Sequence, residues 1–135
     1  IDDPNTGGVR ETTPEIVRKI NVSQEALDLV TDAMVEVNKS GTGARVFAGV
    51  PYSVAGKTGT AQVISIGQNE KYNAARIAER FRDHSLYVAF APAEKPQVAV
   101  ALVVENGGFG AAAAAPIARQ VFDHLLVKQG ANSAR

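Results

Sequence analysis

Residues 54–63 read VAGKTGTAQV and bring one lysine, two threonines and two glycines together within positions 56–60. Such a run suits two kinds of chemistry. It can end a loop that holds the phosphates of a nucleotide, or it can form a strand that carries Lys57, Thr58 and Thr60 into a site for acyl transfer. The flanking residues decide between these alternatives.

The flanking residues argue against a phosphate-binding loop. That motif needs a glycine, four residues, then Gly-Lys-Ser/Thr, and a helix that begins directly afterwards. Pro51 occupies the position of the first glycine. Residues 59–64 contain a glycine and β-branched side chains and are a poor start for a helix. The sequence therefore favours a strand in an acyl-transfer site.

Each residue type of this strand has a use in acyl transfer. Lys57 can hold a proton near a nucleophile, the hydroxyls of Thr58 and Thr60 can bind a substrate carboxylate, and Gly59 leaves the strand flat for substrate. Because side chains alternate along a strand, the two threonines should share one face and Lys57 should lie on the other. The Thr60 amide is a candidate oxyanion donor, since edge strands have unpaired N–H groups.

The elements before this strand are predicted to be an irregular arm and one helix. Prolines and glycines interrupt any period over residues 1–22. Ser23 is a suitable N-cap for a helix over residues 24–39, whose apolar residues recur at helical spacing. We expect a brief extended segment over residues 46–50 and the motif strand over residues 53–64.

After the motif strand we expect a polar excursion with a short helix over residues 70–83. Strands over residues 85–91 and 97–105 are joined by a proline-bounded turn and predict an antiparallel hairpin. The nearly continuous apolar run over residues 98–104 is typical of a central strand that is buried on both faces.

The chain is expected to finish with a helix that ends near Lys128. Pro116 suits an early position in it, and the residues from Ile117 to Leu126 form a broad apolar face that we expect to pack on the sheet. This order of elements predicts an α+β fold, an antiparallel sheet with flanking helices, rather than the alternating strands and helices of a nucleotide-binding fold.

Composition limits the classes of function. The 135 residues suit one domain, and the formal net charge of +0 gives no overall positive surface for nucleic acid. The chain has no cysteine, so thiolate metal sites are excluded. Its longest apolar run, residues 98–104, is far shorter than the ~20 residues of a membrane span. We expect no nucleic-acid partner, no membrane segment in this chain, no metal and no cofactor.

Two stretches of the sequence resemble class B penicillin-binding proteins, and among them those of cell elongation. The stretches are residues 54–63 and YNAARIAERFRDHSLYVAFAPAEKPQVAVALVVENGG, residues 72–108. The resemblance covers most of the chain from about residue 44, and RIAERFRDHSLYVAFAP is far more specific than the four-letter motif. It implies the β-lactamase-like fold of a penicillin-binding transpeptidase domain.

The resemblance also implies a function, that of a peptidoglycan D,D-transpeptidase at the periplasmic face of the bacterial inner membrane, anchored there by a segment absent from this chain. Such an enzyme acylates a serine with a D-Ala-D-Ala stem peptide, releases D-alanine and crosslinks a neighbouring strand. β-Lactams acylate the same serine. Besides stem peptides and β-lactams, proteins of the elongation machinery are expected partners.

Carried over to this chain, the resemblance gives roles to four residues. Lys57 and Thr60 would be catalytic: Lys57 would hydrogen-bond a serine of the second family motif, and the Thr60 amide would complete the oxyanion hole. Thr58, Gly59 and Thr60 would bind substrate, with the two threonine hydroxyls holding the terminal carboxylate.

Two motifs of the family are missing from the sequence. No serine of the chain is followed by lysine three residues later or by asparagine two residues later. We therefore predict that residues 1–135 are the C-terminal part of a transpeptidase domain, with an irregular arm over residues 1–22 and a disordered tail over residues 128–135. By itself this part should form no acyl-enzyme. The alternative is a non-catalytic binding or scaffold module of the same fold.

Other polar and glycine residues have simpler interpretations. His84 and His124 are expected to be hydrogen-bonding residues rather than acid-base groups. The charged residues from Glu79 to Asp83 suggest a solvated helix face, with a substrate or partner role left open. The glycines of residues 107–110 indicate a strand-to-helix turn with positive φ.

Overall fold

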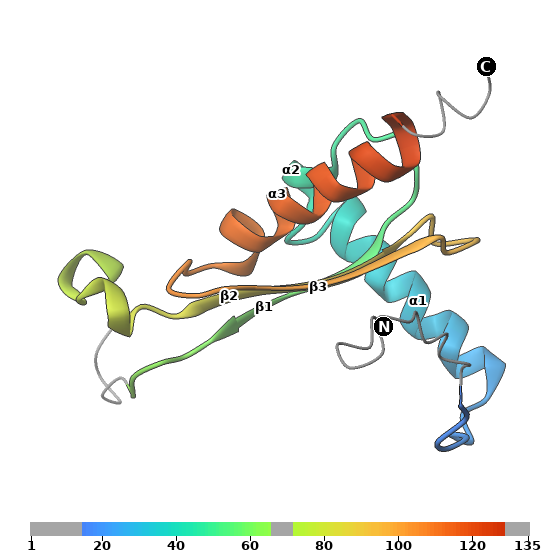
Figure 1. The fold of residues 1–135 in the computed structure, drawn as a ribbon, viewed down its shortest axis with the longest axis horizontal. Helices are drawn as coiled ribbons and strands as arrows, with labels where there is room; N and C mark the ends of the chain where they lie inside the picture. The colour runs from blue at the N-terminus through green and yellow to red at the C-terminus, as the bar shows by residue number, and fades with distance from the viewer. Residues whose placement is uncertain (1–14, 66–71, 129–135) are drawn as a thin grey trace, which may run out of the picture.

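The computed structural model describes residues 15–65 and 72–128 of the chain. The predicted α+β class is confirmed, because these residues form a three-stranded antiparallel sheet with flanking helices (Figure 1). The helices and strands in chain order are α1 (Gln24–Lys39), α2 (Ala44–Phe47), β1 (Ala55–Ala61), β2 (His84–Ala91), β3 (Val98–Val104) and α3 (Gly110–Phe122). Short 3₁₀ turns at Ala74–Arg76 and Glu79–Phe81 lie between β1 and β2, and a π-helical stretch, Asp123–Lys128, continues α3.

The strands lie in the order β1-β2-β3, which confirms the hairpin predicted for the second and third strands. β2 is the middle strand of the described sheet, and β3 lies at the edge opposite β1. The prediction of a central strand from the apolar run over residues 98–104 is therefore wrong within the described residues. Ala99, Ala101 and Val103 are exposed, because the described part of the chain covers one face of β3 and leaves the other open.

Helix α3 lies across one face of the sheet (Figure 1). Its buried residues are chiefly small, so its backbone approaches the strands closely, and Phe122 fills the space near its C-terminal end. The side chains of β2 that face it are also mostly small, except for the fully buried Tyr87. The core therefore lies between α3 and the sheet, and its buried members are Phe47, Val54, Tyr87, Ala89, Ala91, Ala114, Ala115, Ala118 and Phe122.

Helix α1 confirms the predicted helix over residues 24–39. Ser23 caps it, since its Oγ accepts a hydrogen bond from the Ala26 amide at 3.2 Å. The apolar side chains of its first half stay exposed, with 71% of Leu29 and 57% of Val30 accessible to solvent. The buried residue of α1 is Asn38, near the end that meets the sheet.

Other local predictions are corrected by the structure. The segment expected to be extended over residues 46–50 overlaps the helical turn α2, which is held because Phe47 stacks on Tyr87 with ring centroids 5.8 Å apart. The short helix expected over residues 70–83 is reduced to the 3₁₀ turns. Pro116, expected early in the last helix, lies inside α3 because the preceding alanines already belong to it.

Parts of the predicted arm and tail lie outside the described residues, namely 1–14 and 129–135. The described residues of the arm, 15–22, belong to no helix or strand. Within residues 15–65 and 72–128, no helix is both long enough and apolar enough to cross a membrane.

Candidate active site

The motif residues lie on β1, an edge strand whose pairing with β2 fixes their directions. Thr58 is opposite Tyr87 and Thr60 is opposite Ser85, while Lys57 is opposite the half-exposed Val88. Cross-strand partners share a face of the sheet. The two threonines therefore lie on the face that α3 covers, and Lys57 lies on the open face, as the alternation of side chains predicted.

Lys57 is exposed on the open face. Its ammonium group donates a hydrogen bond to the backbone carbonyl of Thr58 at 2.7 Å. This bond keeps the lysine against the outer side of its own strand. The side chain has no ion-pair partner among the described residues, so its charge is available to a group that approaches β1 from this side.

The hydroxyl of Thr58 lies 2.8 Å from the hydroxyl of Thr42, which comes from the turn between α1 and α2. Thr60 is exposed at the same edge. The structure thus adds a third hydroxyl to the two expected from the motif. Sequence reasoning missed Thr42 because the residues around it, Ser40 to Gly43, indicate only that a helix ends there.

The N-terminus of α3 presses on β1 at Gly59. A Cβ atom on Gly110 would lie 2.6 Å from the Leu86 carbonyl and would also collide with the backbone of Gly59. Gly110 is therefore a glycine because two backbones meet at this point. The predicted turn of positive φ is confirmed at Gly108, with φ 73°, but Gly107 and Gly110 do not have positive φ, and Gly110 belongs to the helix.

Ser85 fixes the first turn of α3 beside Thr60. It is fully buried, its hydroxyl donates to the Phe109 carbonyl at 3.2 Å, and it accepts from the Ala114 amide at 3.0 Å. Because Ser85 is also the cross-strand partner of Thr60, the start of α3 and the end of the motif are held in one arrangement.

A buried polar group anchors the start of β1. The Asn38 amide donates to the Val54 carbonyl at 3.0 Å and accepts from the Tyr87 hydroxyl at 2.8 Å. Burial raises the pKa of the Tyr87 hydroxyl above its ordinary value, while the hydrogen bond to Asn38 lowers it by less. Gly56 makes room for this pair, since a Cβ atom there would lie 2.8 Å from Cζ of Tyr87.

A second set of bonds ties the segment before β1 to the end of α3. Arg119 donates to the Val46 carbonyl at 2.5 Å and lies 3.4 Å from the carboxylate of Asp123. The same carboxylate accepts from the Tyr52 hydroxyl at 2.6 Å. Ser53 is also held, through its contact with Glu94 and through the Ala93 amide, which donates to its hydroxyl at 2.8 Å.

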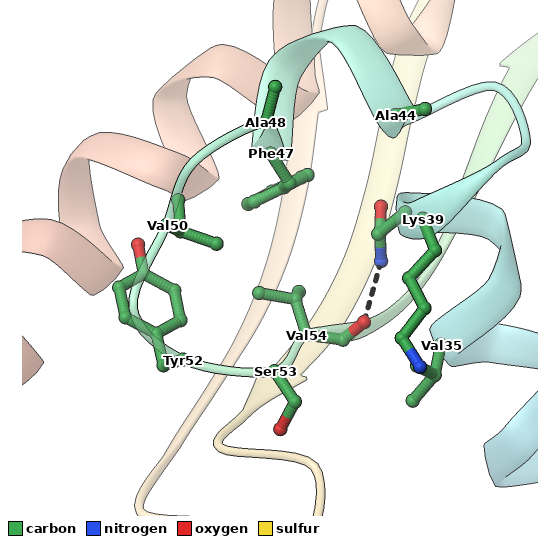
Figure 2. Close-up of a pocket in the computed structure, with 10 residues that line it drawn as sticks. Val35, Lys39, Ala44, Phe47, Ala48, Val50, Tyr52, Ser53 and Val54 are labelled. Atoms are coloured by element: carbon green, nitrogen blue, oxygen red, sulfur yellow. Dashed lines mark hydrogen bonds between the residues drawn. The ribbon is translucent and has the colours of Figure 1, made fainter.

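Two recesses adjoin these elements. One, of about 320 Å³, lies between α1, α2 and the segment before β1, and Phe47, Val50 and Val54 are among the residues that line it (Figure 2). No motif residue lines it. The other, of about 410 Å³, is lined by Thr42, Arg45, Val46, Phe109, Ala111 and Ala112, and so includes the hydroxyl that meets Thr58.

The remaining candidates of the sequence play other parts. His84 accepts a hydrogen bond from the Asn106 amide at 2.9 Å, in agreement with its expected role. Asp83, expected on a solvated helix face, is only 6% exposed. Its carboxylate accepts a hydrogen bond from the Val63 amide, its own amide donates to the Tyr72 hydroxyl, and its carbonyl accepts from the Gly108 amide. His84 lies close to the motif in the sheet, since it is the cross-strand partner of Ala61, but its side chain has no hydrogen bond to a motif residue among the described residues.

Comparison with known protein families gives one match over nearly the whole chain. The sequence model of the penicillin binding protein transpeptidase domain matches residues 2–123. Peptidoglycan D,D-transpeptidase MrdA of Escherichia coli K12 is 49% identical over 102 residues, which are 74% of this chain and 16% of that relative. The chain therefore spans a small part of the length of the curated relative that it matches.

Solved structures give the same result. PBP2 of Pseudomonas aeruginosa, in complex with WCK 5153, superposes with a TM-score of 0.69 at 38% identity, over 90% of this chain and 24% of that one. The penicillin G acyl-enzyme complex of penicillin-binding protein A from M. tuberculosis gives 0.58 at 33% identity, over 91% and 25%. PBP2 of Helicobacter pylori, in complex with MreC, gives 0.55 at 27% identity, over 76% and 18%.

Proposed function

This chain belongs to the penicillin-binding protein transpeptidase family, and we propose that it is the C-terminal part of the transpeptidase domain of a peptidoglycan D,D-transpeptidase. The whole enzyme would crosslink stem peptides through a serine acyl-enzyme, and β-lactams would acylate the same serine. The observation that carries this proposal is the edge strand β1, which has Lys57 on one face and the hydroxyls of Thr58 and Thr60 on the other.

The two threonine hydroxyls bind the carboxylate at the end of the substrate. A hydroxyl can donate one hydrogen bond, and donation to a charged acceptor is stronger than donation to a neutral one. The terminal D-alanine of a stem peptide and a penicillin both carry such a carboxylate close to the carbonyl that is attacked. Because β1 is an edge strand and Thr60 is exposed, a ligand has room to lie alongside β1.

The Thr60 amide is the oxyanion donor in this proposal. Along an antiparallel strand the N–H and C=O of one residue point to the same side, and the side alternates from residue to residue. The Thr58 carbonyl is reached by the Lys57 ammonium group, which fits a carbonyl that points away from β2. Two residues later the Thr60 amide points the same way. One such donor is worth roughly 3 kcal/mol in the transition state.

Lys57 assists the transfer of the proton from the nucleophilic serine without accepting that proton, because its ammonium group is a hydrogen-bond donor only. Its ammonium group sits on the open face of the sheet, opposite α3, and needs only to exchange the Thr58 carbonyl for a serine hydroxyl of the second family motif. Its charge would favour proton transfer toward the leaving amine and would attract the anionic substrate. No described acidic group holds it away from that position.

The nucleophile must come from residues outside this chain, because the sequence has neither Ser-x-x-Lys nor Ser-x-Asn. The exposed apolar surface supports this view. Val103 is 62% exposed and Val88 is 48% exposed on the face that carries Lys57, and Leu29 is 71% exposed on α1. Surfaces of this kind are typical of an interface, here one with the rest of the transpeptidase domain. We propose that this chain alone is inactive.

Location and partners follow from the same proposal. The parent protein would be anchored in the bacterial inner membrane with this domain in the periplasm, where its peptidoglycan substrate lies. The H. pylori relative in complex with MreC supports an association with proteins of the elongation machinery. The Thr58–Thr60 edge needs no metal or cofactor for the chemistry proposed here.

A second candidate is a non-catalytic binding or scaffold module of this fold. The sequence upstream of Ile1 in the parent gene distinguishes the two: Ser-x-x-Lys and Ser-x-Asn there support the enzyme, and the absence of both supports the module. Intact-mass measurement after incubation with penicillin should show an adduct on the parent protein and none on this chain. A stable adduct on this chain would refute its proposed inactivity.

Lys57→Ala in the parent protein tests the role of the motif. Acylation by penicillin should fall by roughly 100-fold or more, as expected for loss of a proton-transfer group. Lys95→Ala, which removes an exposed lysine from the β2–β3 turn, is the matched control and should react like the wild type. Near-normal acylation of the Lys57 variant would remove this lysine from the mechanism.

A further inference from the structure

The hydroxyl of Thr42 is not part of the motif, but it lies 2.8 Å from the hydroxyl of Thr58. We propose that Thr42 is a positioning residue for the carboxylate of the substrate: it donates to Thr58, so that Thr58 can donate to the carboxylate. This inference rests on the function proposed above, and it extends the carboxylate subsite beyond the motif.

The direction of the hydrogen bond decides what Thr58 can do. Each hydroxyl has one proton and can also accept, and the distance allows either one to be the donor. If Thr58 donates to Thr42, the Thr58 hydroxyl has no proton left to donate and presents only lone pairs to the incoming carboxylate. If Thr42 donates, the Thr58 proton is free for the ligand. A carboxylate selects the second arrangement, and consecutive hydrogen bonds strengthen each other.

The turn that carries Thr42 is held rigidly. The Gly43 amide donates to the Val37 carbonyl at 2.9 Å, and the Ala44 amide donates to the Gly41 carbonyl at 3.1 Å. Neither glycine tolerates a side chain easily, since a Cβ atom on Gly41 would lie 2.9 Å from Cα of Val37. The turn therefore keeps its position when a ligand arrives, so the alignment of Thr42 with Thr58 costs little at that moment.

One buried side chain holds both partners of this pair in register. Asn38 packs directly under Gly43, next to Thr42 in the chain, and its amide binds the Val54 carbonyl at the entry to β1. Its side-chain oxygen accepts from the hydroxyl of Tyr87, the cross-strand neighbour of Thr58. The turn and the strand are thus fixed to the same group, which explains how two residues from separate elements meet at hydrogen-bond distance.

Thr42 is also accessible from solvent, as a residue near a ligand must be. It is exposed, and it lines the recess of about 410 Å³ together with Arg45 and Phe109. Arg45 adds positive charge to this wall, which favours an anion at the edge of β1. Among the described residues, neither Thr42 nor Thr58 has another hydrogen-bond partner for its hydroxyl, so the pair is free to orient toward the ligand.

The test compares Thr42→Val with Thr42→Ser in the full-length parent protein. Benzylpenicillin and its methyl ester are the probes, because the ester keeps the reactive ring and lacks the carboxylate charge. Thr42→Val should lower the rate constant of acylation by benzylpenicillin about tenfold, which corresponds to about 1.4 kcal/mol, and should change acylation by the ester less than about twofold. Thr42→Ser, which keeps the hydroxyl, should react like the wild type.

A double variant tests whether Thr42 acts through the hydroxyl of Thr58. In a Thr58→Val background, Thr42→Val should have no further effect on acylation by benzylpenicillin, since the hydroxyl through which Thr42 acts is gone. Equal losses with the acid and the ester, a serine variant as slow as the valine variant, or additive losses in the double variant would each overturn the inference. Thr42→Ala replaces Thr42→Val if the latter does not fold.

The same acylation measurements distinguish an error in the proposed function from an error in the role of Thr42. If the wild-type parent protein is not acylated, or if Lys57→Ala is acylated normally, the proposed function is wrong. If the wild type is acylated, Lys57→Ala is not, and Thr42→Val still reacts like the wild type with benzylpenicillin, only the role of Thr42 is wrong.

Discussion

Replacing Asn38 by leucine should destabilise the domain strongly, even though leucine keeps the branched shape of the side chain. Asn38 is 6% exposed and serves two buried groups, the Val54 carbonyl and the Tyr87 hydroxyl. A buried polar group that loses its partner costs about 1–3 kcal/mol. Two such groups give a loss of roughly 2–6 kcal/mol in the free energy of unfolding.

A second substitution, at Tyr87, separates the contributions of the two bonds. Tyr87→Phe alone should cost about 1–3 kcal/mol, because it leaves the Asn38 oxygen without its donor. Combined with Asn38→Leu, however, it removes the hydroxyl that the leucine left unpaired, and only the Val54 carbonyl stays unsatisfied. The double variant should therefore be more stable than Asn38→Leu by about 1–3 kcal/mol.

Urea unfolding of the complete transpeptidase domain, followed by circular dichroism, measures these differences. The free energies are compared at equal slopes, since a changed slope would signal a change in the denatured state. Two results would contradict a stabilising role for these bonds: a free energy of unfolding of Asn38→Leu within about 0.5 kcal/mol of the wild type, or further destabilisation of the leucine variant by Tyr87→Phe. Either result would mean that the two bonds contribute little to the anchoring of β1.

Two further predictions concern the packing and the pH dependence of the same region. Gly110→Ala should lower the free energy of unfolding by about 1–3 kcal/mol, because its methyl group would lie 2.6 Å from the Leu86 carbonyl; an unchanged thermal midpoint would contradict this contact. The contribution of Tyr87 to the free energy of unfolding should be fully present below about pH 10 and decrease above it. Above that pH tyrosine ionises in the unfolded chain, while burial keeps the pKa of Tyr87 higher in the folded protein. Tyr87→Phe should make the alkaline part of a stability profile flatter, and a profile identical to that of the wild type would exclude Tyr87 as its cause.

Much of the fold was predictable where local signals agree. The N-cap Ser23 and the helical spacing behind it located α1, and the turn between residues 92 and 96 located the hairpin of β2 and β3. The motif strand was predicted too long at both ends: residues 53–64 were expected, and the strand in the structure is Ala55–Ala61. The alternation along that strand also gave the correct faces for Lys57 and the threonines.

What was missed depends on contacts between distant residues. Helix α2 has no capping side chain and only one turn, and it exists where Phe47 packs on Tyr87, forty residues away in the chain. Thr42 looks like an ordinary residue at a helix end until the turn is placed against β1. The exposure of Val103 was missed for a different reason. An apolar pattern indicates that a side chain is suited to burial, but it does not show whether other residues of this chain pack against it.

The contact between α3 and the sheet leaves the strand edge unusually sensitive to distant changes. Where Gly110, Ala114, Ala115 and Ala118 meet the strands, the helix presents bare backbone and methyl groups. Glycine and alanine have no rotamers, so an added methylene at this contact cannot be absorbed by a side-chain rotation and must be taken up as a displacement of whole elements. A single substitution in α3 is therefore expected to shift β1, the strand that carries Lys57, Thr58 and Thr60.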